Sequence, residues 1–472
     1  MGRLKKLLSN TAILGAGTFI SKVLVFLLMP LYTTCLSEAD YGIADILMQT
    51  ANLILPIAVI GISDGLFRFT IDAEPHRRKE IFTVSVITLL VGMLPLALLI
   101  QLFGFISVYQ GYVWLVFLYI CSANLHLIVA NYVRGCDRTK TFAVQGIINT
   151  VLVILFNVLF LVVFKMGVTG YLLSVVLADF LVSVGLIIFC RLYRDIKPRG
   201  ISKSLIKDLF KFSIPYIPLT LMWTITSASD RFVILAMCGE EGTTINGLYA
   251  AAYKLPTLIT IAGGIFIKAW HISSVSENDV EERSRFFGTV YKNYICLMFA
   301  CGTCLVAVSK TFTKLWLDER YYESWEFVPV LGIAMIFSAF SEFLGSVYFV
   351  NKKSTRSLVT AAIGAITNII LNFVLIPHWK AMGAAIATAV CYALVFLIRI
   401  IDTQRYIRFN RAIVKTIINT LVIVAQVVFM LLEFPFWWIY QIGFVAFMLV
   451  FNGREILNSV LKIVKKINRK KI

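Results

Sequence analysis

The sequence predicts an all-α polytopic membrane protein with about 14 transmembrane helices. Of its 472 residues, 59% are hydrophobic and only 15% are charged, and the mean hydropathy is +0.85. A soluble chain of this length needs more polar surface to cover its core. The apolar residues also fall in blocks of about twenty between short polar loops, which is the length that spans a bilayer. The predicted spans cover residues 10–32, 43–69, 81–103, 111–133, 142–164, 168–190, 213–238, 247–271, 287–309, 327–350, 358–377, 383–402, 411–432 and 435–452.

The distribution of cations predicts the orientation of these spans. Most Lys and Arg residues lie in alternate loops and in the two terminal segments. The other loops hold only Lys165, Lys310, Lys314, Arg320 and Lys380. Because cytoplasmic loops carry the excess of cations, both termini are expected in the cytoplasm. The same rule explains the net charge of +18 without nucleic acid as a partner.

The chain contains an internal repeat. A shift of 205 residues places Gly42 on Gly247, and a shift of 216 places Tyr132 on Tyr348. Two six-helix lobes are therefore expected, related by a pseudo-two-fold axis along the membrane normal, with a C-terminal helix pair outside the repeat. The predicted parts are a first lobe at 1–190, a cytoplasmic amphipathic linker at 191–212, a second lobe at 213–402, the helix pair at 403–452 and a basic amphipathic tail at 453–472. The linker and the tail are expected to contact membrane lipids.

Polar residues follow one helix face in each of four spans, the first, second, seventh and eighth. A cation at mid-membrane costs about 2.5–3.5 kcal/mol on insertion scales, so it is expected to face water, a partner or a substrate. Lys22 is the central cation of the first span and has no carboxylate one turn away. The candidate substrate-binding residues are Lys22, Arg231, Lys254 and Lys268.

Several ionisable residues have a structural interpretation beside the functional one. Asp64 and Arg68 are four residues apart in the favourable order for a helical ion pair. Asp45, Asp230, Arg231 and Lys254 are all expected near the outer face, where they form either a closing salt-bridge cluster or part of the substrate path. His126 and Glu342 occupy equivalent repeat positions, and Asp179 lies in the sixth span; polar packing competes with proton or sodium coupling for each. The gate or coupling candidates are Asp45, Asp64, Arg68, Asp230 and Glu342.

Other chemistry is not indicated. The nine cysteines lie mostly within predicted spans, where they are small packing residues, and the four histidines show no metal-ligand spacing. Motifs for catalysis or for a phosphate-binding loop are absent from the sequence, so neither a metal nor a cofactor is expected.

Two stretches resemble a known family. The segments "SASDRFVILAMCGEEGTTINGLYAAAYKLPTLI" at 227–259 and "LSEADYGIADIL" at 36–47 are similar to the polysaccharide-biosynthesis flippases. These are the oligosaccharide-lipid branch of the multidrug/oligosaccharidyl-lipid/polysaccharide exporter superfamily. The resemblance implies alternating access by two lobes, a central cavity, and an undecaprenyl-pyrophosphate-linked sugar as substrate. It also implies that Lys22 holds the pyrophosphate.

The expected function is therefore a flippase that moves a lipid-linked oligosaccharide to the outer leaflet. The product class, O-antigen, capsule or another exopolysaccharide of the cell envelope, is left open, and a polysaccharide polymerase and glycosyltransferases are candidate partners. One alternative is a multidrug cation antiporter of the same superfamily, which would need a net acidic site. Another is a membrane-embedded polysaccharide polymerase, which would need a larger outer loop than the one at 310–326.

Overall fold

The computed structural model describes residues 23–24, 26–197, 201–274, 280–351 and 353–468, and the regular elements in these segments are all helices. The predicted all-α polytopic membrane fold is confirmed. Two compact units divide the chain. Unit 1 comprises Met1–Leu235 and Glu240–Gly247, and unit 2 comprises Ala236–Gly239 and Leu248–Ile472. The five-part division given above stays a prediction; in the structure most of α10 (Tyr216–Met237) belongs to unit 1.

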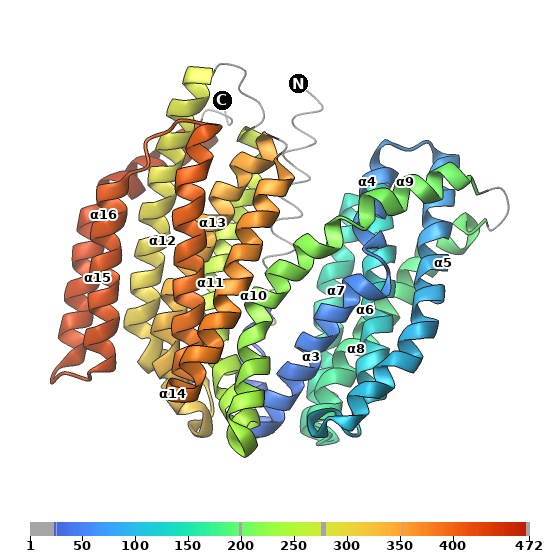
Figure 1. Cartoon of the computed structure of the whole chain (residues 1–472), viewed down its shortest axis with the longest axis horizontal. Coiled ribbons are helices and arrows are strands. Elements are labelled where there is room, and N and C mark those ends of the chain that lie inside the picture. Colours follow the sequence, from blue (N-terminus) through green and yellow to red (C-terminus); the bar gives the residue numbers. More distant parts are fainter. Residues whose placement is uncertain (1–22, 25, 198–200, 275–279, 352, 469–472) are drawn as a thin grey trace. The chain divides into compact units, whose positions relative to one another are not determined.

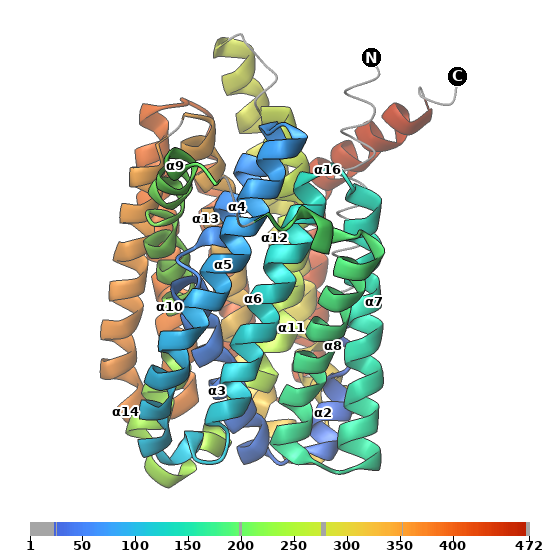
Figure 2. The ribbon, with the colours of Figure 1, turned by 90° about the vertical axis from the view of Figure 1, so that its right-hand side faces the viewer.

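Unit 1 is a bundle of long helices whose neighbours pack along their length. Figure 2 shows α5, α6 and α8 of this bundle, and α6 packs against both α5 and α8. The start of α3 is capped by Ser37, whose Oγ accepts a hydrogen bond from the N–H of Asp40 at 3.1 Å. The long helices are α2 (Met29–Cys35), α3 (Glu38–Ala58), α4 (Ile62–Asp72), α5 (Pro75–Leu99), α6 (Val113–Gly135), α7 (Thr139–Asn157) and α8 (Gly167–Phe189).

The span predicted over 43–69 is divided into two helices. Helix α3 contains Pro56 in its last turn, and the backbone then takes positive φ at Ile60 (53°) and Gly61 (62°). The N–H of Gly61 bonds to the carbonyl of Pro56 at 2.8 Å, which ends α3 before α4 begins. Proline removes a helical donor and glycine accepts the left-handed backbone, so the break follows from these two residues.

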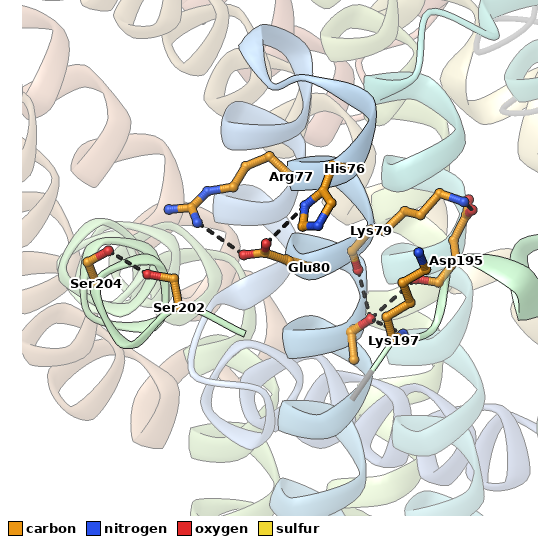
Figure 3. A network of polar contacts seen from close by, with 9 residues as sticks. His76, Arg77, Lys79, Glu80, Asp195, Lys197, Ser202 and Ser204 are labelled. Atoms are coloured by element: carbon orange, nitrogen blue, oxygen red, sulfur yellow. Dashed lines mark hydrogen bonds and ion pairs between the residues drawn. The ribbon is translucent and has the colours of Figure 1, made fainter. Parts of the chain in front are cut away.

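The linker docks on unit 1 through both polar and apolar contacts. Its first part is held to α5 by an ion pair of 2.8 Å between Lys79 and Asp195, and by Thr83, whose Oγ1 accepts the N–H of Lys197 at 2.9 Å (Figure 3). Its helix, α9 (Lys203–Ser213), buries Leu205 and Leu209 in a hydrophobic cluster with residues of α4, α5, α6 and α8. The apolar face of this amphipathic helix is therefore covered by protein.

Unit 2 contains the remaining long helices, of which α12 packs against α13, α15 and α16 (Figure 1). Helix α14 changes direction at Lys380, where φ is 46° and ψ is −127°, so it corresponds to the two spans predicted at 358–377 and 383–402. The helices are α11 (Gly242–Ser274), which starts in unit 1, α12 (Val280–Trp316), α13 (Phe327–Val350), α14 (Ser354–Asp402), α15 (Ile413–Leu431) and α16 (Trp437–Asn468).

Length and composition qualify nine segments of the described chain as candidate membrane spans. One of these, Thr355–Arg405, has 51 residues and includes the change of direction at Lys380, so it is long enough for two crossings. The apolar helix Trp437–Gly453 is shorter and is not included in the nine.

One hydrogen bond recurs in both units at equivalent places. In unit 1 the hydroxyl of Tyr132, near the end of α6, donates to Asp195 at 3.1 Å. In unit 2 the hydroxyl of Tyr348, near the end of α13, donates to Asp402 at 2.8 Å. Tyr132 and Tyr348 are the pair that the sequence repeat aligns. The bond ties the end of α6 to the turn after α8 in unit 1, and the end of α13 to the last residue of α14 in unit 2.

Replacement of Leu209 tests whether the linker helix is part of the core of unit 1. Leu209 is fully buried, so Leu209→Ala should destabilise the protein by about 2–4 kcal/mol through lost contacts and a residual cavity. Lys207→Ala is the matched control, because Lys207 lies exposed on the same helix and its loss should change stability by less than about 0.5 kcal/mol. Thermal unfolding in neutral detergent measures both. Equal effects of the two variants would contradict the docking of α9.

Candidate functional site

A buried ion pair joins α3 to α10 within unit 1. Nε of Arg231 donates to Oδ2 of Asp45 at 2.6 Å, and the two side chains are only 5% and 9% exposed. Nη1 of Arg231 also donates to the backbone carbonyl of Ser227, one turn earlier on the same helix. Charge-assisted hydrogen bonds of this kind are short and strong. Two residues that the sequence placed near one another are thus brought together.

Aromatic residues pack beside this ion pair. Tyr41 lies one turn before Asp45 on α3 and is 1% exposed. Its ring is 6.3 Å from that of Tyr32 on α2 and 6.2 Å from that of Tyr171 on α8, while the rings of Tyr32 and Tyr171 are 4.8 Å apart in an edge-on arrangement. Such pairs add packing energy and exclude water from their surroundings. The surrounding aromatic cluster therefore keeps the ion pair in a dry environment.

Two glycines allow a close approach of helix starts beside the pair. A side chain at Gly42 would lie 1.9 Å from the carbonyl oxygen of Thr243, and one at Gly247 would lie 1.8 Å from that of Glu38. Only glycine fits such a contact. The side-chain amide of Asn246 adds a hydrogen bond across this contact by donating to the carbonyl of Gly42 at 2.9 Å. Gly42 and Gly247 are equivalents in the sequence repeat, and in unit 1 they meet.

The other candidates for substrate contact are not gathered around this pair in the described part of unit 1. Lys22 lies outside the described residues, and so does the side chain of Lys268. Lys254 is partly buried on α11 in unit 2. Asp230 is fully buried on α10, next to Arg231 in the chain.

The remaining gate or coupling candidates are exposed. Asp64 and Arg68 lie one turn apart on α4, and Glu342 lies on α13. Because these side chains are exposed on helices that the sequence predicts to span the membrane, their partners can be lipid, water or substrate as well as protein.

A second polar cluster lies inside unit 1 between α6, α7 and α8. Nδ1 of His126 is 3.0 Å from Oδ1 of Asp179, and its Nε2 is 2.8 Å from Oε1 of Gln145. Asn149 donates to the same Asp179 oxygen at 2.9 Å. His126 is 17% exposed and Asp179 10%. The imidazole thus lies between a carboxylate oxygen and an amide oxygen.

Sequence reasoning singled out His126 and Asp179 but missed the two amide residues. Gln145 and Asn149 are four apart in the predicted span 142–164, so they share one face of that helix. That spacing was the available signal. Arg399 was also missed, because it was counted with the loop that follows. It is 1% exposed, and it donates to Thr360 Oγ1 at 3.0 Å and to the carbonyl of Ser341 at 2.8 Å.

Neither cluster forms a metal centre. Across the described segments, no three His, Cys, Asp or Glu side chains come together as metal ligands. What the first cluster can do is hold two helices in register by a pair of opposite charges. What the second can do is take up and release a proton, since histidine titrates in the physiological range.

Comparison with known proteins places the chain in a family. The family model described as "Polysaccharide biosynthesis protein" matches residues 7–270, more than half of the sequence. The chain belongs to this family. No match was found among curated proteins.

Solved structures share the fold at low sequence identity. The lipid II flippase MurJ in an inward closed conformation superposes with a TM-score of 0.72 at 13% identity, covering 95% of this chain and 100% of that one. An inward-facing multidrug resistance MATE family transporter of the MOP superfamily gives 0.66 at 16% identity, over 82% of this chain and 95% of its own. An outward-facing MATE transporter gives 0.59 at 14%, over 84% and 94%. The fold of this family member is thus that of multi-pass membrane transporters.

A double-mutant cycle tests the buried pair. Asp45→Ala leaves an uncompensated buried guanidinium, and Arg231→Met leaves a buried carboxylate, so each should destabilise the protein by about 3–5 kcal/mol. The double variant should lose less than the sum by about 1–3 kcal/mol, because neither charge remains. Thermal unfolding of the purified protein measures this. Asp45→Ala with Leu209→Ala is the control and should be additive; additivity of the ion-pair variants as well would show that the two charges do not interact.

Proposed function

We propose that the protein is a flippase that translocates an undecaprenyl-pyrophosphate-linked oligosaccharide from the cytoplasmic to the outer leaflet by alternating access. It would act in a bacterial inner membrane, with both termini in the cytoplasm, and would supply the export of a cell-surface polysaccharide such as O-antigen or capsule. Membership of the polysaccharide biosynthesis family is the observation that carries this proposal. The fold shared with the lipid II flippase MurJ supports it.

The charges of the candidate site favour an anionic substrate. Arg231 is neutralised by Asp45, so it serves the structure while that pair is closed. The cation that remains among the described candidates is Lys254, which is partly buried on a helix that the sequence predicts to span the membrane. Lys22 and Lys268 are the further cations proposed to meet the pyrophosphate. A pyrophosphate group carries the charge that such lysines bind.

A multidrug cation antiporter is the second candidate, and the fold shared with MATE transporters favours it. A cationic drug would need a net negative site. Asp45, the acid among the predicted polar stripes, is held by Arg231 in the structure. The four residues that the sequence predicts for substrate contact, Lys22, Arg231, Lys254 and Lys268, are all cations, which speaks for the flippase.

Reconstitution of the purified protein into liposomes tests the two candidates. A fluorescent undecaprenyl-pyrophosphate sugar should become accessible to an added quencher, whereas efflux of ethidium should match that of protein-free liposomes. Lys22→Ala and Lys254→Ala should each lower translocation at least tenfold, because the anionic headgroup loses a counter-charge. Lys140→Ala, which removes an exposed lysine from α7, is the control. Ethidium efflux without lipid translocation would replace the flippase with the antiporter.

We further propose that translocation is coupled to protons through His126 and Asp179. The ring contacts Asp179 from α8 and Gln145 from α7, and Asn149 fixes the carboxylate. Tyr119, on the same helix as His126, is the further titratable group that interacts with Asp179. A proton gained by the imidazole strengthens its contact with the carboxylate, and a proton lost weakens it. The packing of α6 against α7 and α8 would change with that step.

Gradient-driven transport tests this coupling. An acidic outer compartment should accelerate translocation by the wild type, and His126→Gln should abolish that acceleration while retaining slow exchange without a gradient. The reason is that glutamine keeps a hydrogen bond but carries no titrating charge. Ser122→Ala, at another buried polar position of α6, should keep the response. Acceleration by a sodium gradient in place of the proton gradient, or an unchanged response in His126→Gln, would contradict the proposal.

A further inference from the structure

A basic cavity of about 830 Å³ lies in unit 2, between the start of α12 and the segment that follows α14. Four cations line it, and the described residues that form its wall include no Asp or Glu. Arg285 and Lys292 come from α12, and Arg405 and Arg408 come from the following segment. Arg405 lies 3.6 Å from one acid, Asp402, which is not among the residues of the wall. On the orientation that the positive-inside pattern predicts, this cavity lies at the cytoplasmic surface of the membrane.

The wall of the cavity is held by specific hydrogen bonds. The hydroxyl of Ser284 on α12 donates to the carbonyl of Arg408. The N–H of Phe409 donates to Oε1 of Gln404 at 3.2 Å, and the N–H of Ala412 donates to Oδ1 of Asn410 at 2.9 Å. The first bond holds the segment against α12, and the other two fix the backbone of the segment itself. The guanidinium groups are thus presented by an ordered wall rather than by a free chain.

The equivalent place in unit 1 contains side chains that hold the linker to α5. The repeat shift of 205 places Ser284 on Lys79 and Gly288 on Thr83. In unit 1 that place is closed, because Lys79 meets Asp195 and Thr83 binds the N–H of Lys197 (Figure 3). In unit 2 a serine and a glycine replace the two larger side chains. The acid at the end of the equivalent helix, Asp402, bonds to Tyr348 as Asp195 bonds to Tyr132, and its cationic neighbour is Arg405 at 3.6 Å. The second copy thus has a cavity with four cations where the first has the ion pair of Lys79 and Asp195.

One acid outside the wall of the cavity forms an ion pair with a cation of the wall. Glu455 on α16 accepts from Lys292 at 2.9 Å and from Lys415 at 2.7 Å. Burial alone would raise the pKa of this carboxyl, but the hydrogen bonds from Lys415 and Lys292 prevail and lower its pKa to about 2. It is thus ionised at neutral pH and shares Lys292 with the cavity.

We propose that this cavity binds the phosphate group of an anionic phospholipid headgroup from the adjacent leaflet. Guanidinium groups match phosphate oxygens in a fork geometry, and basic pockets between helices on the cytoplasmic side suit such headgroups. The volume admits a glycerol phosphate with its attached glycerol, and the wall lies at the ends of membrane helices, where headgroups are found. This binding is independent of which substrate the protein carries.

Binding of short-chain phosphatidylglycerol to the full-length protein in neutral detergent tests the proposal. Arg405→Gln/Arg408→Gln should weaken binding at least about tenfold. The double variant removes two of the four cations, and each cation near the membrane surface attracts an anionic lipid. Lys353→Gln/Arg356→Gln is the matched control. It removes two exposed cations from another loop of unit 2 that is predicted to be cytoplasmic, and it should leave the affinity within about twofold. Equal weakening by both pairs would overturn the site in favour of diffuse surface charge.

A gain-of-affinity variant separates the site from a folding defect. Glu455→Gln releases Lys292 toward the cavity, so it should tighten phosphatidylglycerol binding several-fold, and a misfolded protein would not produce this result. Phosphatidylcholine of the same chain length should bind weakly to every variant. If inorganic phosphate saturates the wild type and not Arg405→Gln/Arg408→Gln, while the two lipids bind alike, the ligand is a soluble phosphate compound and the lipid assignment is overturned.

Discussion

A charge placed in the apolar interior of a membrane protein must be met by an opposite charge or by several polar groups. The pair of Asp45 and Arg231 meets this constraint at 2.6 Å in unit 1, and it determines how α3 and α10 face one another. The helix starts beside it approach until only glycine fits at Gly42 and Gly247. A desolvated ion pair is favourable only at short range and in good geometry, and the close approach of the starts of α3 and α11 fits that requirement.

The same constraint is met in a second way by hydroxyl and carbonyl oxygens around a buried cation. Arg399 uses a hydroxyl and backbone carbonyls, including that of Ser341, as acceptors. Such a cation is fixed by the fold and is not offered to a substrate. Lys254 differs, because it is partly buried on a helix of the predicted polar set. Whether a buried cation serves structure or substrate thus depends on the number of acceptors around it, which hydropathy alone does not reveal.

Much of the fold and part of the site follow from the sequence. Block length and composition predicted the helices, and the face and depth of Asp45 and Arg231 predicted that they could meet. The partners of His126 could not be named, because they depend on the rotation of α7 about its axis, which turns Gln145 inward. The division between α3 and α4 was also missed, since hydropathy is continuous across Gly61 while the backbone is not. The basic cavity forms because a loop folds back against a helix, and the periodicity of helical sequences does not predict the conformation of a loop.

The duplication shows which contacts the architecture needs. Both units keep a tyrosine–aspartate hydrogen bond, at Tyr132 and Tyr348, because each must fix a helix end against a later segment. The ionisable residues differ instead. Lys22 aligns with Ser227, and His126 aligns with Glu342. A symmetric scaffold with asymmetric charges suits a substrate whose two ends differ, such as a charged headgroup on an apolar chain. Only one copy then needs to supply each charge, and the other copy is free to provide packing or a different ligand.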